Sequence, residues 1–161
     1  MGSQLNNQRD VGSKPLTIGQ NPRRKQALAE LTARLGLADS TAVQWELLDQ
    51  ALVDISSSAE HNIEVLEFLG DAALRLAAAE FLHETHPHMS VGEMAAVRSQ
   101  LVSDRTLAAL AQDYDFGRYL QISASAAGDR AGQGSRLAAA IEAVLGALYM
   151  SPRDLSLNRP W

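Results

Sequence analysis

The segment from about Asn62 to Thr85, NIEVLEFLGDAALRLAAAEFLHET, constrains the fold more than any other part of the chain. Apolar side chains recur along it at helical spacing, and it ends before His86-Pro87, where the proline disfavours further helix. The segment therefore predicts a long helix. Gly70 conflicts with that pattern, because glycine inside a helix costs roughly 1 kcal/mol relative to alanine. A glycine kept there predicts that another helix or backbone segment approaches closely.

The remaining periodic segments also predict helices, and no segment has the alternating pattern of a strand. Apolar residues make up 46% of the chain and aromatic residues only 5%, so alanine and leucine supply most of the hydrophobic surface. This composition favours helix over sheet, and we predict an all-α fold. The further helices are expected at about Arg23 to Gly36, Val43 to Val53, Ser90 to Tyr114 with Ser90 as the cap, and Arg136 to Met150.

The 161 residues are enough for one domain with a hydrophobic core. Residues 1–22 lack periodicity and are expected to form a flexible tail, with one domain over residues 23–161. The chain ends at Arg159-Pro160-Trp161, where a complete domain would be expected to continue into another helix, so we expect a shortened end. No cysteine is present, which excludes disulfides and thiolate zinc sites. No apolar run approaches the roughly 20 residues of a membrane span, so a cytoplasmic protein without membrane contact is expected.

Glu64, Glu67 and Asp71 lie at i, i+3 and i+7 of the long helix. At about 100° per residue, the three carboxylates project within a narrow sector of one face, where they repel one another. A divalent cation such as Mg²⁺ would turn this repulsion into coordination, because it binds through a few carboxylates and water. The alternative on spacing alone is a solvated polar stripe, since surface acids are common. The net charge of −5 does not exclude a nucleic-acid partner, because a metal-dependent nuclease concentrates carboxylates around its cations.

The run from Glu64 to Asp71, EVLEFLGD, resembles the signature of the bacterial ribonuclease III family, E-x-L-E-F-L-G-D. The resemblance continues through Gly92 to Ser103 (GEMAAVRSQLVS) and Ala138 to Tyr149 (AAAIEAVLGALY). It implies a helical bundle that dimerises through the signature helix. It also implies an endoribonuclease that cuts double-stranded RNA, in rRNA and mRNA processing, and leaves 5′-phosphates.

The same resemblance assigns roles to individual residues. Glu67, Asp71 and Glu142 match the acids that hold Mg²⁺, for which Mn²⁺ is a substitute, and Asp71 and Glu142 match catalytic residues. Glu64 matches a supporting acid near the dimer interface. Phe68 matches the aromatic side chain that the family inserts into a socket on its partner in a homodimer. The alternative for Phe68 is an ordinary core residue.

The sequence departs from the family pattern at one metal ligand. The last helix of the family carries D-x-x-E, and the matching residues here are Ala139 and Glu142. Val53-Asp54, Val65 and Val91 also differ from the usual residues. The missing carboxylate at Ala139 predicts an impaired nuclease. The alternative is an inactive module of the same family that binds double-stranded RNA or dimerises with an intact partner, and the family's usual RNA-binding domain is not found in the sequence.

Two weaker sets of candidates remain. Single arginines are candidates for phosphate contacts, although each is equally well interpreted as a solvated surface residue: Arg98, Arg105, Arg130 and Arg136. His83 and His86 could share a metal, but histidine at the end of a helix more often stabilises the helix dipole.

Overall fold

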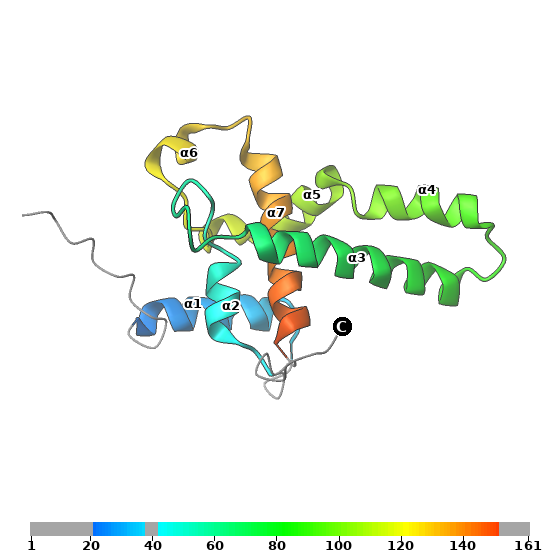
Figure 1. Ribbon diagram of the computed structural model, residues 1–161, viewed down its shortest axis with the longest axis horizontal. Coiled ribbons are helices and arrows are strands. Elements are labelled where there is room, and N and C mark those ends of the chain that lie inside the picture. Colours follow the sequence, from blue (N-terminus) through cyan, green and yellow to red (C-terminus); the bar gives the residue numbers. More distant parts are fainter. Residues whose placement is uncertain (1–20, 38–41, 152–161) are drawn as a thin grey trace, which may run out of the picture.

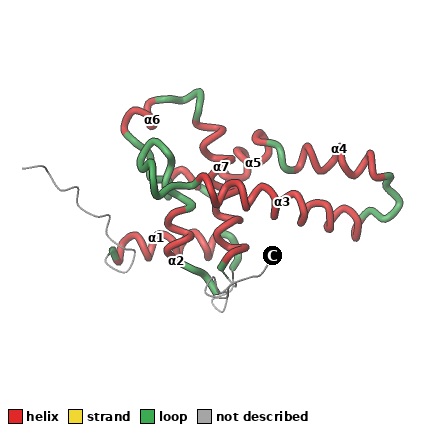
Figure 2. Tube along the Cα trace, viewed as in Figure 1, coloured by secondary structure: helices red, strands yellow, loops and turns green. Residues whose placement is uncertain are grey.

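Helices and loops make up the computed structural model, which describes residues 21–37 and 42–151 (Figure 2). Within these ranges no strand forms, and the only bridge is an isolated parallel one between Val53 and Gln121. This confirms the all-α prediction. In the same ranges no helix is both long and apolar enough to cross a bilayer. The elements in chain order are α1 (Pro22–Arg34), α2 (Trp45–Gln50), α3 (Glu64–Thr85), α4 (Val91–Leu101), α5 (Asp104–Asp113), the 3-10 helix η2 (Phe116–Arg118), α6 (Ala124–Gly128) and α7 (Gln133–Met150).

Helix α7 is the centre of the fold, and its most extensive contacts are with α3 and α5 (Figure 1). A helix that is apolar around most of its circumference is stable only when other helices surround it. This describes α7, whose buried residues are Leu137, Ala138, Ala140, Ile141, Ala143, Val144, Gly146 and Ala147. Helices α1 and α2, with the turn that follows α2, complete the core with Leu28, Leu31, Leu48 and Leu52.

An ion pair joins α1 to the rest of the core. Arg24 Nε lies 2.6 Å from Asp49 Oδ1 on α2, and its Nη1 donates to the carbonyl of Tyr119 over 2.7 Å. One guanidinium therefore links three segments that are distant in sequence, which fixes α1 beside α2 and η2.

Helix α3 extends well beyond its crossing with α7, and α4 runs back along it to form a projecting hairpin (Figure 1). No residue of α4 is buried. Its start is set locally, because Ser90 and Glu93 form a reciprocal capping box with Ser90 as the cap, as predicted. We refer to the part of α3 beyond Leu76 together with α4 as the arm.

Several predicted boundaries are wrong. The single helix expected from Ser90 to Tyr114 is two helices, because the Ser103 hydroxyl accepts a hydrogen bond from the Thr106 amide (3.3 Å) and starts α5 after Val102. A short helix that was not predicted, α6, is capped by Ser123, and α7 begins at Gln133 instead of Arg136. Helix α1 begins at Pro22 with Asn21 as its cap. The rest of the predicted tail and the chain end after Ser151 lie outside the described residues.

Candidate active site

Two glycines bring α3 and α7 into backbone contact. A Cβ atom added to Gly70 of α3 would collide with the carbonyl oxygen of Glu142, and one added to Gly146 of α7 would collide with the carbonyl oxygen of Leu66. Each glycine thus faces the backbone of the other helix. This confirms the close approach predicted from Gly70, and it fixes Glu142 beside the turn of α3 that carries Glu67 and Asp71.

The acids of this crossing lie within electrostatic range of one another. The pKa of Glu142 rises from its usual 4.5 to about 7, first because the carboxyl group is partly buried and then because Asp71, Glu67 and Asp104 are near. The Arg75 guanidinium opposes that rise. Burial also raises the pKa of Glu67, with Glu64, Asp104 and Asp71 adding repulsion. We refer to Glu67, Asp71 and Glu142 as the acid cluster.

Asp104 is an acid near the cluster that sequence reasoning missed. It is the first residue of α5 and raises the pKa of both Glu67 and Glu142. The sequence predicted one continuous helix across α4 and α5, so Asp104 was not recognised as the first residue of a helix. Ser103 followed by Asp104 was the available signal, since a serine cap and an acid in the first turn typically start a helix.

Asp71 is already paired within its own helix. Arg75 Nε lies 2.7 Å from Oδ1 and 2.9 Å from Oδ2 of Asp71, one turn away along α3. The hydrogen bond with Asp71 and the negative charge of Asp71 raise the pKa of Arg75 above its usual value, and the charge of Glu142 adds to the effect. The cluster therefore contains one cation of its own.

The donor atoms fit a hard divalent cation, since all are carboxylate oxygens in a region of unbalanced negative charge. The spacing of these acids does not fit such an ion. Among the described residues, no group of three or more His, Asp or Glu side chains is close enough to hold a metal ion. Electrostatic coupling extends further than coordination distance, so the two observations are compatible. The crossing gathers the acids into one neighbourhood without closing them into a ligand cage.

Ala139 lies on α7 one turn before Glu142, where a carboxylate would share the face of Glu142. Its methyl group packs against the hydrophobic core and is partly exposed. Val91, at the start of α4, is exposed. Two positions at which the sequence departs from its family pattern thus hold side chains that cannot ligate a cation.

Asn62 fixes the start of α3, and sequence reasoning gave it no role. This buried side chain donates from Nδ2 to the carbonyls of Ser58 (3.0 Å) and Ala59 (3.1 Å). Its Oδ1 accepts from the Glu64 amide over 3.0 Å. A helix start leaves amide groups without partners, and Asn62 satisfies one of them while closing the preceding loop. The direction in which α3 leaves this loop is therefore set by Asn62.

The outer face of α3 is apolar and exposed. Val65, Phe68 and Leu76 have exposed fractions of 66%, 76% and 57%. At about 100° per residue they lie on the side of the helix opposite Gly70. Phe68, at the edge of this side, lies one turn from both Glu64 and Asp71. Ala79 and His83 continue this side into a pocket of about 180 Å³ that α4 completes with Val91, Met94, Ala95 and Arg98. We call this pocket the arm pocket.

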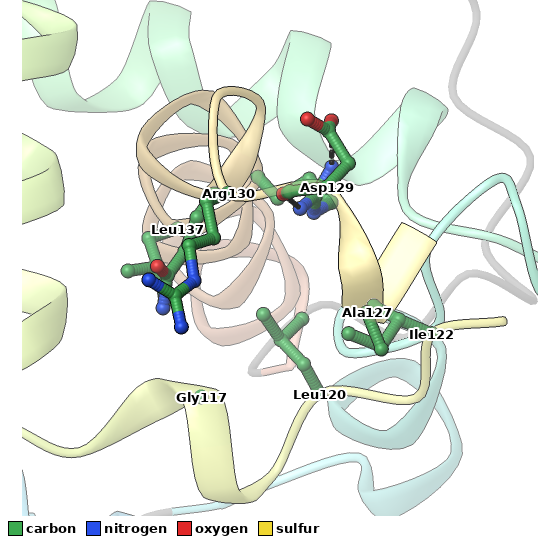
Figure 3. A pocket seen from close by; sticks show the side chains of 9 residues that line it. Gly117, Leu120, Ile122, Ala127, Asp129, Arg130 and Leu137 are labelled. Atoms are coloured by element: carbon green, nitrogen blue, oxygen red, sulfur yellow. Dashed lines mark hydrogen bonds and ion pairs between the residues drawn. The ribbon is translucent and has the colours of Figure 1, made fainter. Parts of the chain in front are cut away.

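The four candidate arginines do not form one patch. Arg98 lines the arm pocket, and its buried Nε has no hydrogen-bond partner. Arg105 is exposed on α5. Arg130 and Arg136 line a different pocket, of about 290 Å³, between η2, α6 and α7. Figure 3 shows Arg130 and Leu137 on one side of it and Ala127 and Ile122 on the other. Arg136 is paired with Asp129, whose carboxylate also accepts from the amides of Ala131 and Gly132.

Comparison with known protein families matches residues 64–153 to the Ribonuclease III domain. A Nostoc sp. protein named Ribonuclease 3 2 is 53% identical over 140 residues, which cover 87% of this chain and 58% of that protein. The Ribonuclease 3 of Gloeobacter violaceus is 52% identical over 143 residues, with coverage of 87% and 59%. The chain thus spans less than two thirds of the length of these relatives.

A solved structure gives the same result for the fold. The nuclease domain of ribonuclease III from Campylobacter jejuni superposes with a TM-score of 0.70 at 28% identity. The match covers 77% of this chain and 85% of that domain. That structure is described as showing structural flexibility in a region involved in dimer formation.

Proposed function

Because the chain belongs to the ribonuclease III family, we propose that it is an endoribonuclease that cuts double-stranded RNA by metal-assisted hydrolysis and leaves 5′-phosphates. The observation that carries this proposal is the acid cluster at the glycine crossing, where Glu142 has a pKa of about 7. Carboxylates that repel one another in a fixed, partly buried position destabilise the protein unless a counter-ion or a proton offsets the repulsion, so such a cluster favours a functional site. Processing of structured rRNA and mRNA in the cytoplasm is the corresponding role.

Glu67, Asp71 and Glu142 would hold Mg²⁺ or Mn²⁺, with Glu64 as a supporting acid one turn before Glu67. Such an ion supplies a more acidic water and neutralises charge on the leaving oxygen. The chain's own contribution is positional, because the backbone contact at Gly70 and Gly146 fixes Glu142 relative to α3. Asp71 and Glu142 are the proposed catalytic residues. The high pKa of Glu142 means that it loses its proton near neutral pH, so full negative charge of the cluster requires pH above about 7 or a bound cation.

We further propose that two copies pair through the outer face of α3. The pocket of about 180 Å³ is comparable to the roughly 150 Å³ cavity that holds benzene in an engineered protein interior. In an antiparallel pair of α3 helices related by a twofold axis near residues 73 and 74, Phe68 of one copy faces Ala79 of the other. Ala79 lines the arm pocket, so each Phe68 would enter the pocket of the partner copy.

We assign the phosphate contacts to Arg105, Arg130 and Arg136. All three lie outside the arm, which is the part of the chain that we propose contacts the partner copy. Arg130 is the best placed of them, since it lines an open pocket and no ion pair holds it among the described residues. Arg98 is not among the proposed phosphate contacts, because it lines the arm pocket.

A second candidate function is supported by the same site. The spacing of the acids, the pairing of Asp71 with Arg75 and the methyl group at Ala139 all favour a module that binds duplex RNA without cutting it. The two functions differ in one property, the formation of cleaved ends.

The test uses a labelled RNA duplex incubated with the full chain, with and without Mg²⁺. Cleavage that requires Mg²⁺ and is lost in Glu142→Gln supports the endonuclease. Retained binding of the duplex with no Mg²⁺-dependent products establishes the binding module. A single-stranded RNA of the same sequence is the control for specificity.

A further inference from the structure

Arg75 is the only basic side chain that interacts with the acid cluster among the described residues. Its Nε is within hydrogen-bond distance of both oxygens of Asp71, at 2.7 and 2.9 Å. Its charge also acts on Glu142 across the crossing, and that effect is reciprocal. One guanidinium thus interacts with two of the three acids that would hold a cation.

We propose that Arg75 is an internal counter-ion of the acid cluster, which holds Asp71 along α3 until a divalent cation displaces it. This inference rests on the proposed function for the identity of the cation. It explains why the acids share one neighbourhood yet do not reach ligand spacing, because Asp71 is turned toward residue 75 of its own helix. A cation that binds Asp71 must take at least one oxygen that Arg75 now occupies.

The counter-ion relieves the repulsion of the empty site. Without Arg75, the partly buried acids Glu67 and Glu142 would face Asp71 with no cation nearby. The pair is also weak enough to release, because both side chains are partly exposed and ion pairs four residues apart in a helix are worth little in water. Arg75 is therefore a positioning residue that competes with the cation.

Calorimetric titration of the full chain with Mg²⁺ tests the competition. Arg75→Gln removes the charge and keeps a good helix former, so α3 is expected to remain folded. Mg²⁺ affinity is expected to rise about two- to fivefold, as for the loss of a weak competing ion pair. Arg34→Gln on α1 removes the same charge from an exposed position in another part of the fold and should leave the affinity unchanged.

Nuclear magnetic resonance of the arginine Nε–H groups tests the displacement directly. The Arg75 signal, assigned by its loss in Arg75→Gln, should differ between wild type and Asp71→Asn without metal. Mg²⁺ should move the wild-type signal toward the Asp71→Asn position. Arg24, which is paired with Asp49 away from the cluster, should not respond.

The outcomes separate this inference from the proposed function. If neither wild type nor Arg75→Gln binds Mg²⁺, the proposed metal site is refuted. Identical Arg75 signals in metal-free wild type and Asp71→Asn would refute the ion pair whatever the metal does. Mg²⁺ binding that leaves the Arg75 signal in place, or that is no tighter in Arg75→Gln, would refute the displacement.

Discussion

The crossing of α3 with α7 and the outer face of α3 are two sides of one helix with opposite character. At the crossing, Gly70 and Gly146 remove every side-chain atom between the backbones, and the neighbouring acids are fixed as a result. On the outer face, Val65, Phe68 and Leu76 are exposed and no described element covers them. The crossing is therefore covered by helices of the same chain, whereas the outer face has no partner among the described residues, and there we propose a second copy.

Replacing Gly70 by alanine should break the crossing and have the largest effect of any single change. The new methyl group would overlap the Glu142 carbonyl, which is backbone and cannot move without displacing α7. We expect a loss of roughly 3 kcal/mol or more in the free energy of unfolding, measured by urea denaturation.

Gly134→Ala is the matched control for this change. A Cβ atom there meets nothing within 4 Å, and the residue lies in the first turn of α7. Its effect should be neutral or stabilising by up to roughly 1 kcal/mol. Equal effects of the two substitutions on the free energy of unfolding would contradict the close approach at Gly70.

Phe68→Ala should weaken the proposed contact between two copies and leave the crossing of α3 with α7 unchanged. If the ring fills the arm pocket of a partner, dimer dissociation should become easier by roughly 3 kcal/mol. Sedimentation equilibrium of wild type and variant measures this. Phe81→Ala, the same change on another side of α3, should leave the dimer intact. A wild type that stays monomeric at high concentration would refute the proposed pairing.

The dependence of protein stability on pH should show a smaller effect than the two substitutions above, and this effect should arise at the crossing. The pKa of Glu142 is raised from 4.5 to about 7 in the folded protein, so the folded state holds more protons than the unfolded state between these values. Without metal, stability should therefore fall as pH rises from about 4.5 to about 7. Thermal melts across this window should show a shallower fall for Glu142→Gln. Parallel curves for the two proteins would mean that Glu142 titrates normally.

Sequence reasoning predicted the parts of the structure that depend on local chemistry. The long helix, the Ser90 cap and the close approach at Gly70 all follow from residues that interact within one turn or with a backbone. The family resemblance placed Glu142 beside Asp71, which no local pattern could do across so many residues.

What the sequence could not predict depends on tertiary distances. The break at Ser103 competes with a continuous apolar pattern, and Asp104 joins the acids only because α5 turns back against α7. The arginines were grouped by charge, but Arg98 faces the arm pocket. Arg75 lies four residues after Asp71, a spacing that permits an ion pair within a helix, but the effect of this pair on the acid cluster depends on the position of Glu142.

We propose that the acids at the crossing form a metal-dependent nuclease site whose activity is limited by Ala139. The most direct measurement is the rate of duplex RNA cleavage against Mg²⁺ concentration for wild type and Ala139→Asp. A carboxylate at residue 139 lies one turn before Glu142 and adds a ligand on the same face. We predict that Ala139→Asp reaches its half-maximal rate at a lower Mg²⁺ concentration than wild type. Its maximal rate should be higher by up to about a hundredfold, as expected when a misplaced ion is repositioned by about 1 Å. Equal rates at every Mg²⁺ concentration would contradict the account, because position 139 would then not be a ligand position.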